Sequence, residues 1–210
     1  MSESREKMLE TLLETINEAT LLFSKSGALS DQSMSDGVGL VADALDIDRF
    51  AIWRNSIKAG ELCASRIYRW DREAGNTTLL FPSLDDVPYT RFGVKLEKAF
   101  ALGRSVFCCV SELPEDSVLS SSRIKTAFLS PIFISNELWG FTLFGDTSAE
   151  RVFDTDSLEM MRSAAFMITN TVIRVEMGLR QEVREGTKDV ALALQPLRRV
   201  PCRSSLPGKD

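Results

Sequence analysis

The segment Pro131–Asp146 reads P-I-F-I-S-N-E-L-W-G-F-T-L-F-G-D and carries the clearest structural signal in the chain. It holds parts of two apolar runs, Ile124–Ile134 and Leu138–Phe144, which the polar residues Ser135–Glu137 separate. Two apolar runs joined by a short polar turn are typical of a β-hairpin. The sequence therefore predicts two neighbouring antiparallel strands at this place.

The second strand of this hairpin is expected to distribute its side chains over two faces, because side chains alternate along a strand. One face would carry Trp139, Phe141 and Leu143, and the other Leu138, Thr142 and Phe144. Gly140 has no side chain, so a flanking helix is expected to approach the strand closely there.

The residues before the hairpin change their hydrophobic period. Apolar residues at spacings of three and four predict amphipathic helices over residues 5–26 and about 31–45. The aromatic and β-branched run Arg49–Arg54 then predicts a strand, and Leu62–Trp70 a second one. Asn55–Gly60 between them is expected to form the turn.

Crossover segments are expected between these strands and the hairpin. Thr90–Leu102 predicts a helix that Gly103 ends, and Ser105–Val110 predicts a strand. Leu113–Arg123 contains a proline followed by two acidic residues, which suits a first helical turn.

A long helix is expected after the hairpin, with Asp154 or Thr155 as its cap. Its apolar positions are Leu158, Met161, Ala165, Ile168, Val172, Val175 and Leu179. This order of elements predicts an α+β fold. In it, an antiparallel sheet has the N- and C-terminal helices packed on one face and the crossover segments on the other.

Composition narrows the class of protein. The chain has 210 residues, 44% of them hydrophobic, and a net charge of −5. It has no basic patch interleaved with aromatics, so nucleic acid is not an expected partner. No apolar run approaches the roughly 20 residues of a membrane span, and the N-terminus lacks the apolar centre of a signal peptide. We therefore expect a cytoplasmic protein without a membrane span in this chain.

The sequence has no histidine. This excludes Ser-His and Cys-His nucleophile pairs and histidine ligands of metals. We therefore expect neither a catalytic nor a metal site. The nature of any cofactor stays open.

The chain is expected to divide into four parts. Residues 1–30 would form an N-terminal helix, and residues 31–180 the domain itself. Residues 181–195 would extend the last helix as a coiled coil. Residues 196–210 contain three prolines and no periodicity, and are expected to be disordered.

The quoted hairpin resembles the signature hairpin of GAF domains, in which a Pro-Ile strand, a polar turn and a Trp-Gly start recur in this order. Asp48–Trp53 is similar to the first strand of that family, Gly103–Leu113 to the strand before a Leu-Pro turn, and Glu150–Phe153 to the entry of its last helix. The resemblance covers residues 5–180. It is closest to GAF domains that precede bacterial histidine kinase or diguanylate cyclase modules.

This resemblance implies a sensory domain that binds a small molecule between the sheet and the crossover segments. It also implies an output module that is absent from this chain. The same strand faces predict an apolar pocket wall made of Ala51, Trp53, Leu129, Pro131, Phe141 and Leu143. Trp53 could stack on a planar ligand. The alternative is a structural dimerisation module in which these side chains fill the site.

A third hypothesis is an enzyme. One branch of the GAF family reduces free methionine sulfoxide with cysteines, and this chain has Cys108 and Cys109. Neighbours in a strand point to opposite faces, so at most one of the two can enter the pocket. Their apolar surroundings favour buried, inert thiols. Bilin-binding members commonly use histidines near the pigment, and this chain has none.

The last helix predicts a parallel homodimer. Val172, Val175 and Leu179 keep the three-four spacing beyond the length of helix that the sheet can cover. Burying them requires a partner helix, and a second copy is the simplest one. The first and last helices are therefore expected to form the dimer contact.

Overall fold

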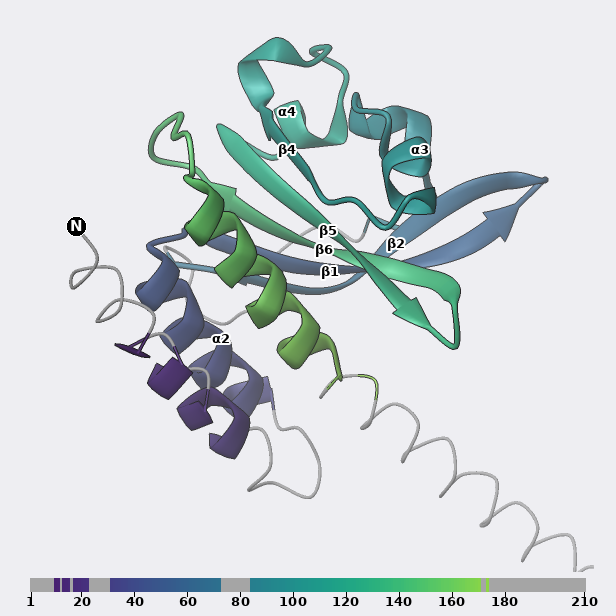
Figure 1. The fold of residues 1–210 in the computed structure, drawn as a ribbon. Coiled ribbons are helices and arrows are strands. Elements are labelled where there is room, and N and C mark those ends of the chain that lie inside the picture. The colour runs from purple at the N-terminus through teal and green to yellow at the C-terminus, as the bar shows by residue number, and fades with distance from the viewer. Residues whose placement is uncertain are drawn as a thin grey trace, which may run out of the picture. The chain divides into compact units, whose positions relative to one another are not determined.

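A six-stranded antiparallel sheet with the strand order β3-β2-β1-β6-β5-β4 is the centre of the computed structural model (Figure 1). The structure describes residues 10–11, 13–15, 17–22, 31–72, 84–170 and 173. The strands are β1 (Arg49–Lys58), β2 (Glu61–Asp71), β3 (Val87–Pro88), β4 (Val106–Cys109), β5 (Thr126–Ile134) and β6 (Glu137–Asp146).

The helical elements lie on the two faces of this sheet. They are α2 (Asp31–Leu45), the 3-10 turn η2 (Tyr89–Phe92), α3 (Leu96–Ala101), the 3-10 turn η3 (Val110–Glu112) and α4 (Val118–Ser121). Helical residues also lie between 10 and 22 and over 155–170. None of the helices among the described residues is long and apolar enough to cross a membrane.

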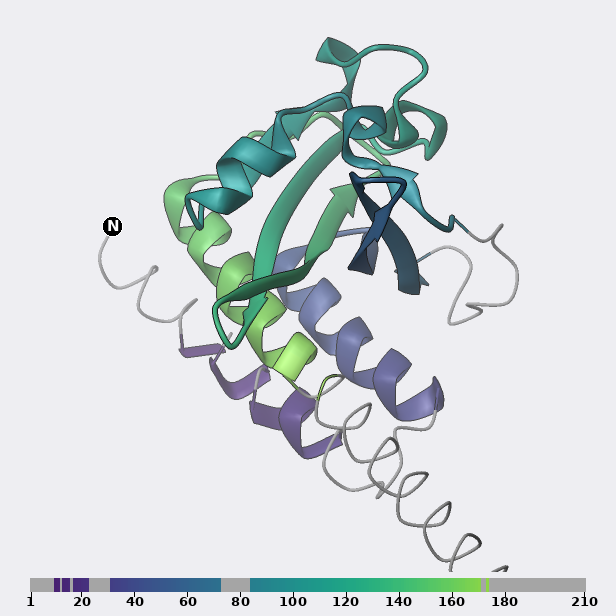
Figure 2. The same cartoon turned by 90° about the vertical axis from the view of Figure 1, so that its right-hand side faces the viewer.

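Helical segments lie over both faces of the sheet (Figure 2), and the buried side chains form two hydrophobic cores. On one face, α2 and the 155–170 helix cover the sheet, and Phe50, Ile52 and Phe144 pack against them. On the other face, α3, α4 and the 3-10 turns pack on a second set of strand side chains. We name the two sides the helix face and the crossover face. The predicted α+β fold is confirmed.

The last helix begins where the sequence predicts. The Asp154 carboxylate accepts a hydrogen bond from the Ser157 backbone N–H at 2.8 Å, so Asp154 caps the helix. The predicted turn at Asn55–Gly60 is wrong in part, because β1 continues to Lys58. Only Ala59 and Gly60 form the turn, both with positive φ.

The crossover helices are shorter than the sequence predicts. Gly93, with a φ of 76°, ends η2 and separates it from α3, so Thr90–Leu102 is not one helix. In Leu113–Arg123 only the four residues of α4 are helical, capped by the Ser117 hydroxyl.

The faces of β6 differ from the prediction at one end. Phe141 and Leu143 lie on the crossover face as expected, but Trp139 packs on the helix face and Leu138 on the crossover face. The cause is a β-bulge: Ile132 pairs with Gly140, and the next residue of β5 pairs with Leu138. Trp139 is the extra residue, so the alternation inverts after it.

The close neighbour of Gly140 is a strand and not the helix that the sequence analysis expected. A Cβ at this position would overlap the carbonyl oxygen of Trp53 and lie 3.1 Å from its carbonyl carbon and 3.2 Å from the Cα of Arg54. The absent side chain therefore allows β1 and β6 to pair at this point.

Asp48 fastens the beginning of β1 to the turn that follows β6. Its Oδ2 accepts hydrogen bonds from the backbone N–H groups of Thr147 and Ser148 at 2.9 and 3.1 Å, and from their hydroxyls at 3.0 and 2.6 Å. Burial alone would raise the pKa of this carboxyl, but the hydrogen bonds favour its charged form and hold the pKa well below the usual range.

Asp48→Ala is expected to lower the free energy of unfolding by about 2–3 kcal/mol at neutral pH, because hydrogen bonds to a charged group contribute about that much. The folded-state pKa is lowered, so this contribution is complete above the unfolded value of 3.8 and is lost as the pH falls below it. Urea unfolding at neutral pH and near pH 3, followed by tryptophan fluorescence, measures both effects.

Asp43→Ala is the matched control for this experiment. Asp43 is exposed and pairs with Arg72 at the surface, so its loss is expected to be much smaller than that of Asp48. A deficit of Asp48→Ala that stayed constant down to pH 3 would contradict the assignment of the stabilisation to the ionised carboxylate.

Candidate functional site

The six predicted pocket residues meet on the crossover face of three adjacent strands. In the registers of β1, β5 and β6, Ala51 and Leu129 both pair with Leu143, and Trp53 and Pro131 both pair with Phe141. Five of the six are buried, and Pro131 is half-buried. The six residues that side-chain alternation selects thus lie close together in the structure.

Aromatic rings from the crossover segments cover these strand residues. Phe141 is fully buried and lies centrally, with its ring centroid 5.8 Å from Trp53 in a stacked arrangement. The ring centroids of Phe92, Phe100 and Tyr89 lie 5.3, 5.6 and 5.8 Å from that of Phe141. We name these five residues the aromatic cluster. They occupy the space between the sheet and the crossover segments.

The sequence analysis missed the three members of the aromatic cluster outside the sheet. Tyr89 and Phe92 lie in η2 and Phe100 in α3, and the aromatic rings at 89, 92 and 100 were the available signal. Strand alternation selects residues of a sheet face, but it does not show which crossover side chains lie over them.

Few polar atoms accompany the aromatic cluster. The Tyr89 hydroxyl donates a hydrogen bond to the Asn55 side-chain oxygen at 2.8 Å, and burial raises the pKa of this tyrosine. The indole N–H of Trp53 is buried and has no hydrogen-bond partner among the described residues. An unsatisfied buried donor costs about 1–3 kcal/mol.

A buried ion pair lies at the end of the same sheet face. Arg49 and Asp71 are direct partners of β1 and β2, and Arg49 Nε donates to Asp71 Oδ1 at 2.8 Å. Arg69 contacts the second oxygen of Asp71. Burial and the charges of Arg69 and Arg49 lower the pKa of Arg66 to about 10, so Arg66 remains charged at neutral pH. The contacts of Arg49 and Arg69 with Asp71 connect the first residue of β1 to the end of β2.

The cysteines are poor nucleophiles in this environment. Cys108 lies in the crossover core, where burial and the charge of neighbouring groups raise the pKa of its thiol to about 11. Burial likewise raises the pKa of Cys109, which points to the opposite face. Because the thiolate is the reacting species, neither thiol is activated at neutral pH.

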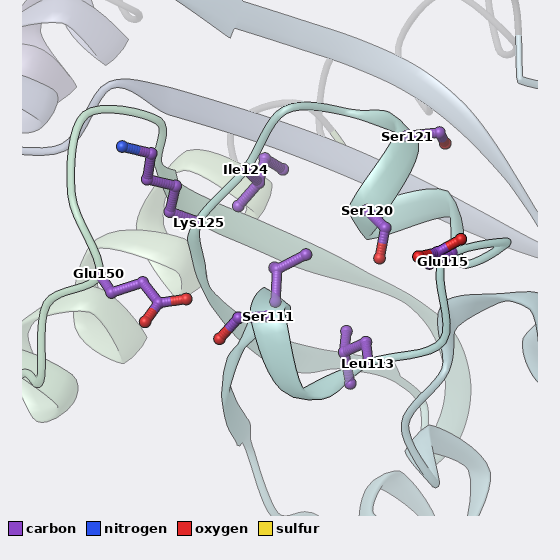
Figure 3. Close-up of a pocket in the computed structure, with 9 residues that line it drawn as sticks. Ser111, Leu113, Glu115, Ser120, Ser121, Ile124, Lys125 and Glu150 are labelled. Atoms are coloured by element: carbon purple, nitrogen blue, oxygen red, sulfur yellow. The ribbon is translucent and has the colours of Figure 1, made fainter.

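Figure 3 shows the residues that line a surface cavity of about 690 Å³, and none of the predicted site residues is among them. Its polar rim includes Ser111, Ser120, Lys125 and Glu150. The Lys125 ammonium donates a hydrogen bond to the Ser148 carbonyl oxygen at 2.6 Å. Within the described part of the chain, no three His, Cys, Asp or Glu side chains are placed to hold a metal ion.

The residues predicted for the dimer contact lie outside the described residues. This holds for Val172, Val175 and Leu179, for the extension 181–195 and for the tail 196–210. Within the described helix, Met161, Ala165 and Ile168 of the same seam are buried against the protein's own sheet.

The chain is similar in sequence to part of a regulatory histidine kinase. No protein-family model matches it. It is 29% identical over 146 residues to the methanogenesis regulatory histidine kinase FilI of Methanothrix harundinacea (strain 6Ac). This alignment covers 69% of the chain but only 16% of the kinase.

Solved structures show the same fold at low sequence identity. One is the phycocyanobilin-bound GAF domain of a cyanobacterial phytochrome, with a TM-score of 0.57, 18% identity, and coverage of 80% of this chain and 96% of that one. Another is the free methionine-R-sulfoxide reductase of Neisseria meningitidis in complex with its substrate. It has a TM-score of 0.55 and 12% identity, and the match covers 80% of this chain and 91% of the reductase.

Proposed function

Because the chain has the fold of GAF domains and resembles part of a regulatory histidine kinase, we propose that it is a regulatory module that dimerises and passes a signal to an output domain. The aromatic cluster is the observation that carries the finer proposal. We infer that the crossover face of this chain is a packed core and not an open ligand pocket.

Packing supports this proposal over a preformed pocket. Trp53, Phe92 and Phe141 are nearly or fully buried by one another and by their neighbours. A small-molecule site needs roughly 300–1,000 Å³ of space lined by side chains. To admit a ligand at the predicted place, the aromatic rings would have to move aside.

A ligand-binding module is the second candidate. The Trp53 indole N–H, which has no hydrogen-bond partner in the described part of the chain, favours it, because a ligand with a hydrogen-bond acceptor could satisfy that donor. Native mass spectrometry and an absorption spectrum of freshly purified protein distinguish the two. A retained small molecule whose binding depends on Trp53 would overturn the packed-core proposal, whereas a bare chain with no thermal shift across a metabolite panel would support it.

Signal transfer in this proposal uses the connection between the sheet and the 155–170 helix. Arg151 lies in that connection and pairs with Asp146 at the end of β6 and with Asp46 after α2. A displacement of the sheet would therefore act on α2 and on the 155–170 helix together. Paired helices that shift or rotate are a known switching element.

Truncation tests the dimer directly. The intact chain is expected to be a dimer at tens of micromolar, and a chain ending at Asn170 is expected to dimerise at least about tenfold more weakly, because it lacks Val172, Val175 and Leu179. Light scattering on both chains measures this. A monomeric intact chain would refute dimerisation, and equal dimers would refute the role of the predicted seam.

The enzyme alternative receives less support. The raised pKa values of Cys108 and Cys109 oppose thiolate chemistry, although the sulfoxide reductase shares the fold. Replacing both cysteines with serine is expected to leave the dimerisation measured by light scattering unchanged. Thioredoxin-dependent reduction of free methionine sulfoxide by the wild type would reverse this conclusion.

A further inference from the structure

A groove of about 590 Å³ runs along the 155–170 helix. We name it the helix groove. Residues of this helix from Arg162 to Asn170 line one side, and Ser130–Phe133 of β5 line another. Among the described strands, β4 pairs only with Thr126–Leu129, so the groove lies beside the part of β5 beyond that pairing. Of the six residues predicted for the crossover-face pocket, Pro131 alone belongs to this lining, so the two sites are largely separate.

The walls of the helix groove are mainly apolar. Phe166, Leu13 and Phe133 are large apolar side chains that line it and are exposed. Ile132 and Ala165 also line it and are buried. Sites for small molecules usually have volumes of roughly 300–1,000 Å³ and predominantly apolar walls with a few polar groups. The helix groove has the size and the walls to cover the apolar body of a small molecule.

Arg162 determines the charge that the groove favours. It is the one charged side chain among the described residues of the lining. It pairs with Glu159, and both side chains are more than half exposed. Such an exposed pair contributes little to stability, and a guanidinium has five N–H donors, so Arg162 can also bind the carboxylate of a ligand. The groove therefore favours an anion over a cation.

Thr169 provides a second polar group. Its hydroxyl is buried and has no hydrogen-bond partner among the described residues, and Thr169 belongs to the lining. Other hydroxyls of the lining have partners: Ser105 donates to the Ser130 hydroxyl at 3.1 Å, and Ser163 donates to the Glu159 carbonyl oxygen at 3.0 Å. Because buried polar groups are normally hydrogen-bonded, Thr169 is the group that a ligand hydroxyl would satisfy.

The two polar groups lie along one stripe of the helix. Arg162, Phe166 and Thr169 follow each other at spacings of four and three residues, so their side chains share a face. At a rise of about 1.5 Å per residue, Arg162 and Thr169 are separated by about 10 Å along the helix axis. Phe166 lies between them. A ligand that contacts all three would carry a carboxylate and a hydroxyl at opposite ends of an apolar chain.

We propose that the helix groove binds a small amphipathic hydroxy acid. Its carboxylate pairs with Arg162, its apolar body lies along Phe166 and Phe133, and its hydroxyl forms a hydrogen bond with Thr169. This goes beyond the proposed function, because it gives the regulatory module an input site outside the packed crossover face. Three of these contacts belong to the 155–170 helix, so the ligand would act directly on the element that the proposed signal uses.

Isothermal titration calorimetry of the full chain with decanoate and with 10-hydroxydecanoate tests the proposal. Both acids are expected to bind saturably, with one molecule per chain. The added hydroxyl is expected to strengthen binding about fivefold, the effect of one hydrogen bond. Arg162→Gln is expected to weaken the binding of both acids about tenfold, because it removes the cation. Thr169→Val keeps the shape of the side chain and is expected to remove the difference between the two acids.

Two controls match these variants. Arg91→Gln neutralises an exposed arginine outside the lining and is expected to leave binding unchanged. Phe166→Glu places a like charge in the groove and is expected to weaken binding at least about tenfold. Ile57→Glu makes the same change at an equally exposed side chain of β1 outside the groove, and is expected to have no effect. Thermal unfolding without ligand shows that each variant folds.

Each outcome decides one question. A wild type without saturable binding would overturn the proposal and leave the packed crossover face and the dimer intact. Binding that survives Arg162→Gln and Phe166→Glu, or that the control variants lose equally, would overturn it as well. A preference for the hydroxy acid that persists in Thr169→Val would refute the Thr169 contact. Binding lost in Trp53→Phe but kept in Phe166→Glu would place the ligand on the crossover face and overturn the packed-core proposal too.

Discussion

Gly140→Ala is expected to abolish stable folding, with a loss of at least about 4 kcal/mol in the free energy of unfolding. The added methyl group would overlap the carbonyl oxygen of Trp53, and the surrounding atoms belong to the β1 backbone and not to a flexible side chain. Relief would require β1 and β6 to separate at the centre of the sheet. Circular dichroism and urea unfolding of the purified variant measure the effect.

Gly39→Ala is the matched control. Gly39 lies within α2, and the nearest atom to an added Cβ would be in the Trp70 ring at 3.8 Å, an ordinary contact. Alanine is a better helix former than glycine by about 1 kcal/mol, so this variant is expected to be as stable as the wild type or more so. A Gly140→Ala protein with wild-type stability would show that the two strands do not approach as closely as described.

Phe141→Ala is expected to destabilise the fold by about 3–5 kcal/mol, because it removes a fully buried ring and leaves a cavity. The loss is expected at the upper end, since the rings of Trp53, Phe92 and Phe100 all surround this one and are held by the sheet and by two crossover segments. Ile57→Ala, at a position that is 67% exposed, is expected to change stability by less than about 0.5 kcal/mol.

The same variant also tests the packed-core proposal. The cavity left by Phe141 would be apolar, and such cavities bind small aromatic molecules. Indole is expected to stabilise Phe141→Ala against thermal unfolding and to leave the wild type unchanged. If indole stabilised the wild type equally, the crossover face would already have room for a ligand.

Much of the fold could be predicted from period and turn signals. The hairpin around Ser135 and Asn136 can be predicted because a polar turn separates two apolar runs. Helix α2 coincides with its predicted range. The face assignment of Trp139 could not be predicted. It depends on a bulge, which is a property of the paired strands and leaves no local sequence pattern.

The candidate site could be predicted only from the sheet side. Trp53 and Phe141 follow from alternation, because they face each other across β1 and β6. Whether the space above them is open depends on Phe92 and Phe100, and their positions are set by the Gly93 break and by tertiary packing. The sequence therefore predicts the strand side chains of the candidate site but not the crossover side chains that pack over them.

Among the described strands, β4 pairs with only Thr126–Leu129 of β5, and the part of β5 beyond this pairing bears on solubility. A free strand edge is a template for uncontrolled strand addition and fibril growth, which soluble proteins suppress with prolines or charges. Pro131 stands in that uncovered part, where it has no N–H to offer to an added strand. We therefore expect Pro131 to hinder the addition of a further strand at this edge.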